Sequence, residues 1–203
     1  MKQQLTSTLL RSRARRLAPV AALCVAALMT ASPAHAAFHL WTIRELYSDS
    51  SGSLQFIELF CTSANQNFLG GQQFTVTPTG GGAGHTFTLP SNASGSTANH
   101  AFLLGTAGIF GAGGPAPDAV IPSSFLFQGG GTISFFGSGG GAYSALPSGG
   151  VLSYAFPSGA LANNSPVNFA GQAGLVVVPE PGTLALVAAG GIGLLCFLRR
   201  SKA

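Results

Sequence analysis

Between residues 37 and 178 the chain consists of short apolar runs separated by clusters of glycine and proline. Such runs, several of which alternate polar and apolar residues, are typical of β-strands, and no stretch has a convincing helical period. We expect about seven strands, at residues 41–47, 54–61, 74–77, 85–89, 101–104, 132–135 and 152–156. This number suits a small antiparallel β-sandwich, so the sequence predicts an all-β fold.

The same stretch can supply a hydrophobic core. Eighteen of the nineteen aromatic residues lie in it, and each buried large side chain stabilises a fold by roughly 1.5–3 kcal/mol. The alternation in residues 41–47 places Trp41, Ile43 and Tyr47 on one face, whereas residues 54–61 are apolar on both faces, as in a central strand. Cys61 is the one cysteine of this stretch, and we expect it to be a buried apolar residue.

Charge is distributed very unevenly along the chain. Five of the nine Lys and Arg residues precede residue 17 and three follow residue 198. Between residues 37 and 178 the single cation Arg44 stands against Glu45, Asp49, Glu58 and Asp118, which gives a net charge of −3. Phosphate contact requires clustered cations, so we expect no nucleic-acid partner.

Residues 1–36 have the features of a secretory signal peptide. A basic leader is followed by a mostly apolar stretch, and Ala34 and Ala36 supply the small residues that signal peptidase requires before a cut at Ala37. A lipoprotein signal that uses Cys24 is the alternative. We expect a β-domain over residues 37–156, and the composition of residues 157–178 predicts a linker that holds it away from the membrane.

The C-terminal segment, residues 179–203, combines three features in a fixed order. Pro179, Glu180 and Pro181 precede an uncharged apolar run at residues 183–198, and Arg199 and Arg200 follow it. Sixteen residues span about 24 Å as a helix, so the run predicts a single transmembrane helix with the arginines on the cytoplasmic side. The two prolines favour an extended peptide just outside the membrane, where a processing enzyme can bind.

This order resembles the PEP-CTERM sorting signal. In that family an exosortase, a membrane protease-transpeptidase, recognises the tail of proteins that Gram-negative bacteria export, often together with extracellular polysaccharide and biofilm matrix. The resemblance implies a recognition role for Pro179, Glu180 and Pro181 and a stop-transfer role for Arg199 and Arg200.

A second resemblance covers residues 38–156. Residues 43–47, Gly52, residues 56–59 and residues 69–71 are similar to the opening of a lamin-tail domain, and residues 101–104 and 131–135 fit its later strands. Cys61 departs from that pattern, in which Asn is usual, and the glycine-rich loops are long. The resemblance implies an immunoglobulin-like sandwich but names no activity, because such domains accompany many functions.

Few residues of the body suggest chemistry. Glu45 and Glu58 could form a catalytic carboxylate pair, but we expect them to accept backbone hydrogen bonds or to pair with Arg44, with Arg44–Glu58 as a structural ion pair. The sequence around Asp49 predicts a hairpin turn and not a calcium loop. His39, His85 and His100 lack the spacing of metal ligands, so we expect no catalytic residue, metal or cofactor.

The sequence therefore predicts an exported, non-enzymatic surface or matrix protein. A β-domain with few charges and many hydroxyl and amide groups suits contact with a neutral polysaccharide, or self-association. Two alternatives stay open. One is a membrane-anchored accessory module of an export system, and the other is a carbohydrate-acting enzyme with two carboxyls in one cleft.

Overall fold

A computed structural model describes residues 38–135 and 139–178 of the chain. Within these residues ten strands and one short 3-10 turn, η1 (Phe110–Ala112), form the fold. The strands are β1 (Thr42–Ser48), β2 (Gln55–Cys61), β3 (Gln73–Pro78), β4 (His85–Thr88), β5 (His100–Gly105), β6 (Ala119–Val120), β7 (Gly131–Phe135), β8 (Gly141–Tyr143), β9 (Leu152–Ala155) and β10 (Leu161–Asn163).

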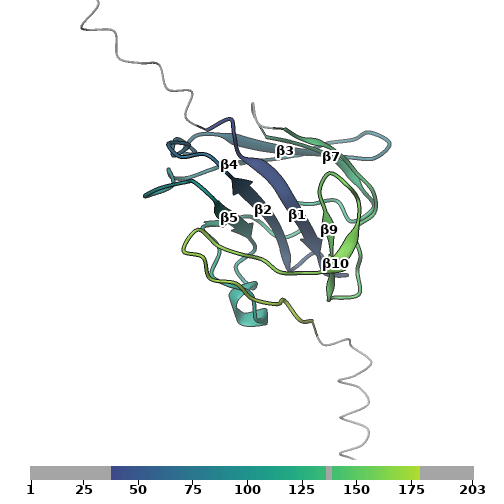
Figure 1. Ribbon diagram of the computed structural model, residues 1–203. Helices are drawn as coiled ribbons and strands as arrows, with labels where there is room; N and C mark the ends of the chain where they lie inside the picture. Colours follow the sequence, from purple (N-terminus) through teal and green to yellow (C-terminus); the bar gives the residue numbers. More distant parts are fainter. Residues whose placement is uncertain (1–37, 136–138, 179–203) are drawn as a thin grey trace, which may run out of the picture. The chain divides into compact units, whose positions relative to one another are not determined.

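The strands form two sheets that lie one over the other (Figure 1). The larger sheet has six strands in the order β10-β9-β1-β2-β5-β6, and the smaller has four in the order β4-β3-β7-β8. Neighbouring strands are antiparallel except for the parallel pair β5–β6. The predicted all-β, sandwich-like fold is confirmed. All seven expected strands are present, whereas β6, β8 and β10, with two or three residues each, were not expected.

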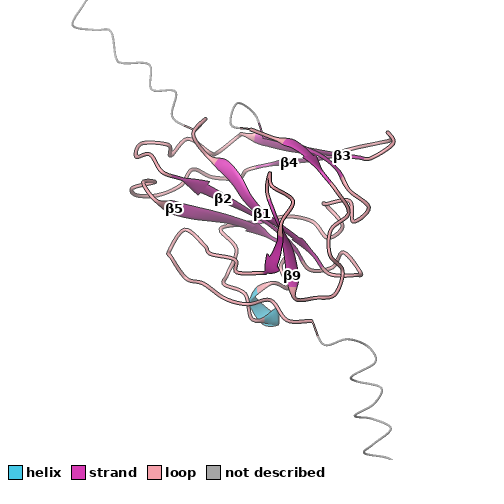
Figure 2. Cartoon of the chain, turned by 45° about the vertical axis from the view of Figure 1, so that its right-hand side comes forward, coloured by secondary structure: helices cyan, strands magenta, loops and turns pink. Residues whose placement is uncertain are grey.

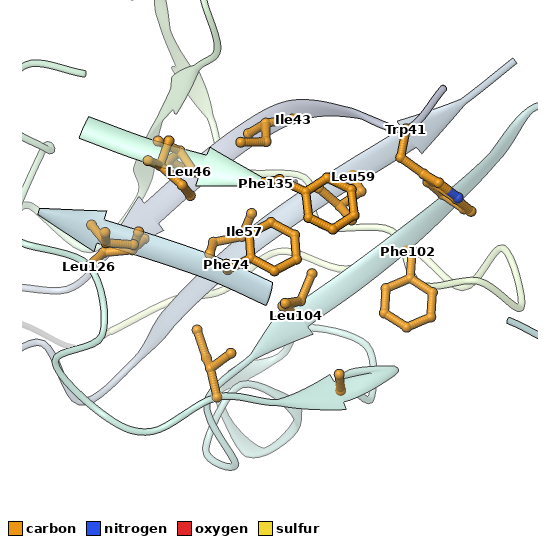
Figure 3. Close-up of a cluster of buried hydrophobic side chains, with 14 of the residues drawn as sticks. Trp41, Ile43, Leu46, Ile57, Leu59, Phe74, Phe102, Leu104, Leu126 and Phe135 are labelled. Atoms are coloured by element: carbon orange, nitrogen blue, oxygen red, sulfur yellow. The ribbon is translucent and has the colours of Figure 1, made fainter. Parts of the chain in front are cut away.

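The main core lies between the two sheets (Figure 3). Phe74 of β3 stacks on Phe135 of β7 with 4.3 Å between ring centroids, and both side chains face Ile57 and Leu104 of the larger sheet. These side chains are almost wholly buried, so this layer supplies most of the apolar stabilisation. Cys61 is also buried, as expected.

An irregularity in β1 divides its side chains between the two faces of the larger sheet. The register with β2 shifts between Ile43 and Glu45, so the alternation changes sides there. Ile43 and Leu46 therefore face the main core, whereas Tyr47 stacks on Phe56 on the opposite, outer face. The prediction that Tyr47 shares a face with Ile43 is wrong because a bulge, invisible in the alternation itself, intervenes.

The predicted linker at residues 157–178 is also wrong, because most of this segment belongs to the fold. Residues of β10 pair with β9, and the following residues run across the outer face of the larger sheet (Figure 2). Val176 is fully buried in a second apolar cluster with Tyr47, Phe56, Leu103 and Ile109. We call residues 164–178 the covering segment.

Candidate functional site

Three carboxylates of the outer face hold the covering segment in place. Glu45 Oε1 accepts a hydrogen bond from the amide of Ser165 at 3.0 Å, and Glu58 Oε2 accepts one from the amide of Val167 at 2.7 Å. Asp118 Oδ2 accepts the amide of Phe169 at 2.9 Å. Successive bonds fall on every second residue, as expected for an extended chain whose alternate amides face one side. The carboxylates thus take the place of a neighbouring strand.

Glu58 lies at the centre of this arrangement. Its side chain is fully buried and forms an ion pair with Arg44, whose guanidinium lies 4.9 Å from the ring centroid of Phe60. Burial disfavours the charged form and raises the pKa of Glu58 to about 7, although Arg44 and the amide of Val167 act in the opposite direction. The predicted ion pair between Arg44 and Glu58 is present.

Asp118 and the fourth carboxylate of the body, Asp49, hold further groups of the chain. Asp118 Oδ2 accepts a second bond from the amide of Leu103 at 2.7 Å, and burial raises the pKa of this carboxyl. Asp49 closes the turn between β1 and β2 by accepting bonds from Ser51, Ser53 and Leu54. Partial burial raises the pKa of Asp49, but these bonds outweigh it and lower the pKa below its ordinary value. The predicted hairpin turn is confirmed.

The positions of Glu45 and Glu58 can be compared with the two roles considered for them, a catalytic pair and a structural one. The two residues are register partners on β1 and β2, so they are brought together. Both are buried, and each accepts an amide of the covering segment that lies over them. Their positions fit the predicted structural role, since substrate could reach them only if the covering segment moved.

The far end of the covering segment is also held by hydrogen bonds. Asn164, nearly fully buried, donates from Nδ2 to the carbonyls of Val151 and Val176 and accepts the amide of Val176 at 2.7 Å. The amide of Val177 donates to the carbonyl of Ala112 at 3.0 Å. Residue 178 is followed directly by the Pro179-Glu180-Pro181 triplet, so the folded body continues to the edge of the predicted processing site.

Another surface is hollowed around His85 of β4 and has both polar and apolar walls. Its ring stacks on Phe127 with 4.5 Å between centroids, and its Nδ1 lies 2.9 Å from the carbonyl oxygen of Phe125. A carbonyl only accepts, so Nδ1 carries the hydrogen of this contact and donates to it. Two adjoining hollows, of about 280 Å³ and 460 Å³, share His85 and Ser124.

The walls of these two hollows carry hydroxyl and amide groups and no carboxylate, lysine or arginine. The residues that line them are Ser51, Gly52, Gln55, Gly84, His85, Thr86, Pro122, Ser123, Ser124, Phe125, Leu126, Phe127 and Gln128. Ser124 has a φ of 59°, which is uncommon for serine, and its amide donates to the carbonyl of Gly52 at 2.8 Å. A glycine at position 52 is needed here, because its φ is +73° and a Cβ would lie 2.9 Å from Ser124 Oγ.

The three histidines of the body make separate contacts. His100 packs on Phe169 with 5.0 Å between centroids and lies 2.9 Å from the carbonyl of Ala98, while His39 is exposed beside Phe38. Among the described residues no group of three or more His, Cys, Asp or Glu could hold a metal ion.

Sequence reasoning missed Ser124, Gln128 and Asn164. Serine and asparagine in a Gly- and Pro-rich context are common in surface turns, so nothing in the sequence separates them from loop residues. Their importance depends on what lies opposite them in the fold.

Several predicted residues fall outside the part of the chain that the structure describes. These are Ala34, Ala36 and Ala37 at the predicted signal-peptidase site, Pro179, Glu180 and Pro181, and Arg199 and Arg200. The predicted transmembrane helix at residues 183–198 lies there too. Across residues 38–135 and 139–178, no helix is long and apolar enough to cross a membrane.

Comparison with known proteins identifies the C-terminal tail. Residues 177–200 match the family model of the PEP-CTERM protein-sorting motif, and this range contains the Pro-Glu-Pro triplet, the apolar run and both arginines. No curated protein and no solved structure matches the chain, and the resemblance to a lamin-tail domain stays a prediction. The chain thus carries a PEP-CTERM sorting motif, which implies export, transient anchoring in the membrane and processing by an exosortase-type enzyme.

Proposed function

We propose that the folded body is a non-enzymatic binding module that the sorting motif delivers to the cell surface or the extracellular matrix, and that its ligand is a neutral polysaccharide. Signal peptidase would remove residues 1–36 and an exosortase-type enzyme would process the tail. This proposal extends the sorting motif, which concerns delivery, to what the delivered domain does.

The proposal rests on one observation: the charged side chains of the described residues are already bonded within the protein. Within the described residues, all four carboxylates accept hydrogen bonds from the protein itself, and Arg44 pairs with Glu58. The hollows around His85 are lined instead by an imidazole ring, serine hydroxyls and the side chain of Gln128, whose Nε2 already donates to the carbonyl of Asp49 at 2.7 Å. A neutral sugar offers hydroxyl groups for hydrogen bonds and apolar C–H faces for ring contact, so its chemistry matches these walls.

The test is retention of the mature protein on exopolysaccharide from the producing cells. We expect retention of the natural sequence, and a loss of about tenfold or more for His85→Ala and for Gln128→Ala, since each removes a ring or amide contact. Gln73→Ala is the matched control, because Gln73 is an exposed glutamine at the start of β3 and lines neither hollow. Retention no better than that of an unrelated β-domain would overturn the proposal.

The competing function is a permanently anchored accessory module of an export system. The direct passage from the folded body to the sorting motif favours short tethering at the membrane. Intact-mass measurement of protein from its native cell envelope separates the two. Loss of the apolar tail supports release to the surface or matrix, whereas a mature chain that keeps residues 183–203 supports the anchored module.

A further inference from the structure

An apolar surface surrounds the point where the folded body passes into the sorting motif. Phe110, on η1, is 69% exposed, and Leu175 and Val177 of the covering segment are 43% and 47% exposed. Leu175 and Val177 line an open hollow of about 580 Å³, whose walls also include Leu54, Ala112 and Val178. Phe110 does not line this hollow but precedes Gly111 and Ala112, which do. We call Phe110, Leu175, Val177 and this hollow the exit patch.

The exit patch is held in shape by backbone contacts. Gly113 and Gly174 let η1 and the covering segment approach closely, since a Cβ at Gly113 would lie 2.6 Å from the carbonyl oxygen of Leu175 and one at Gly174 2.4 Å from that of Gly113. The amide of Val177 donates to the carbonyl of Ala112. Figures 1 and 2 show η1 beside the end of the described chain.

The two segments that form most of the exit patch carry no charge, and the nearest charged residues along the chain are Asp118 and Glu180. These segments, residues 106–117 and 172–178, contain no Asp, Glu, Lys or Arg. Single exposed apolar residues are ordinary on soluble proteins, but a continuous apolar surface of this kind marks a binding surface.

The chain itself limits what can cover this surface. Five residue steps separate Val178 from Thr183, where the uncharged apolar run of the matched motif begins. Five steps span at most about 18 Å when fully extended. Whenever the tail is inserted, the exit patch must therefore lie within a short distance of the bilayer surface.

We infer that the exit patch rests on the membrane while the tail is anchored, with Phe110, Leu175 and Val177 in the interfacial layer of the lipid. Aromatic and aliphatic side chains are favoured at that depth, and residues 106–117 and 172–178 contain no charged side chain that the contact would dehydrate. The contact would fix the orientation of the body on the membrane and would end when processing removes the tail. This inference depends on the sorting motif and not on a polysaccharide ligand.

The test uses the full chain, with Cys24→Ala and Cys196→Ala, in phosphatidylcholine and phosphatidylethanolamine vesicles. A polarity-sensitive fluorophore is attached at Phe110→Cys and, in a separate protein, at Leu175→Cys, while Cys61 stays buried and unlabelled. Phe68→Cys is the matched control. Phe68 is 58% exposed but follows β2, at the end of the larger sheet opposite η1.

We expect quencher-bearing lipids to reduce the fluorescence at Phe110 and Leu175 about twofold or more beyond the reduction at Phe68. Near-ultraviolet circular dichroism confirms that each labelled protein is folded. If one of the two labelled variants fails to fold, the other still tests the inference. Equal quenching at all three positions overturns the inference. So does a probe that is shielded from water but not quenched by lipid, since a second copy or another protein would then cover the patch.

Discussion

The two faces of the six-stranded sheet are covered in different ways. The inner face packs against the smaller sheet through tightly interlocked apolar side chains, among them the stacked pair Phe74 and Phe135. The outer face is covered by a segment without a continuous strand. The buried Glu45 and Glu58 and the half-buried Asp118 accept hydrogen bonds from its amides. In a body with so little charge, the carboxylates act as acceptors for backbone groups that would otherwise lack partners.

This difference predicts that the inner face controls global unfolding, whereas the outer face controls local opening of the covering segment. Loss of an apolar contact on the inner face affects the whole fold, because both sheets share one core. Loss of a carboxylate on the outer face affects first the segment that it holds, because local opening needs only that segment to leave.

The largest expected effect is on the inner face. Phe74→Ala removes a fully buried ring from the stack with Phe135 and should lower the free energy of unfolding by about 3–5 kcal/mol. Urea denaturation followed by tryptophan fluorescence measures this loss, since Trp41 lies in the same core. Phe68→Ala, at an exposed phenylalanine, should change it by less than about 0.5 kcal/mol. Similar losses for the two variants would contradict a single shared inner core.

A smaller and more local effect is expected for Asp118→Ala. It leaves the amides of Leu103 and Phe169 without their acceptor, at a cost of about 1–3 kcal/mol for each buried group. Hydrogen exchange should quicken most across residues 165–177 and least in β3 and β7. Asp118→Asn, which keeps a carbonyl oxygen, is the control and should lie close to the natural protein. Uniform quickening throughout both sheets would show that the two faces are not separable.

The strand pattern of the body could be predicted because alternation and turn residues are local properties. The bulge in β1 could not, since it depends on how Ile43 and Glu45 pair with β2. Residues 157–178, which include the covering segment, have the composition of a linker, with serine, asparagine, glycine and proline. What makes the covering segment part of the fold is a set of acceptors that come from residues 45, 58 and 118 and meet only in three dimensions.

The candidate binding surfaces also could not be predicted from the sequence, because residues distant in the chain form them. The hollows around His85 combine residues from three stretches of the chain, near positions 51–55, 84–86 and 122–128. No local spacing relates these stretches to one another, whereas the sorting motif is contiguous and could be identified from its order alone.

Glu58 makes the outer face sensitive to pH. Because its pKa is about 7 in the folded protein, against an ordinary value of 4.5, the folded state holds this proton more tightly than the unfolded chain. The protonated Glu58 carboxyl therefore contributes fully to the free energy of unfolding below pH 4.5, and this contribution is lost as the pH rises through 7. The expected loss is on the order of 1–3 kcal/mol. Denaturation at several pH values should therefore show the natural protein weakening relative to Glu58→Gln between pH 5 and 8, in about that amount. Parallel profiles for the two proteins would mean that Arg44 keeps Glu58 charged throughout.

The smallest expected effect is that of Leu161→Ala, a variant that tests whether apolar contact helps to hold the start of the covering segment. Leu161 of β10 is 56% exposed, so Leu161→Ala should change the free energy of unfolding by less than about 0.5 kcal/mol. Three residues later, Asn164→Asp replaces the donor to Val151 and Val176 by an acceptor, so hydrogen exchange at Val176 and Val177 should quicken markedly. If Leu161→Ala released the segment as readily as Asn164→Asp, apolar packing at the sheet edge would be its main attachment. The contrast between an apolar inner face and a hydrogen-bonded outer face would then no longer describe the molecule.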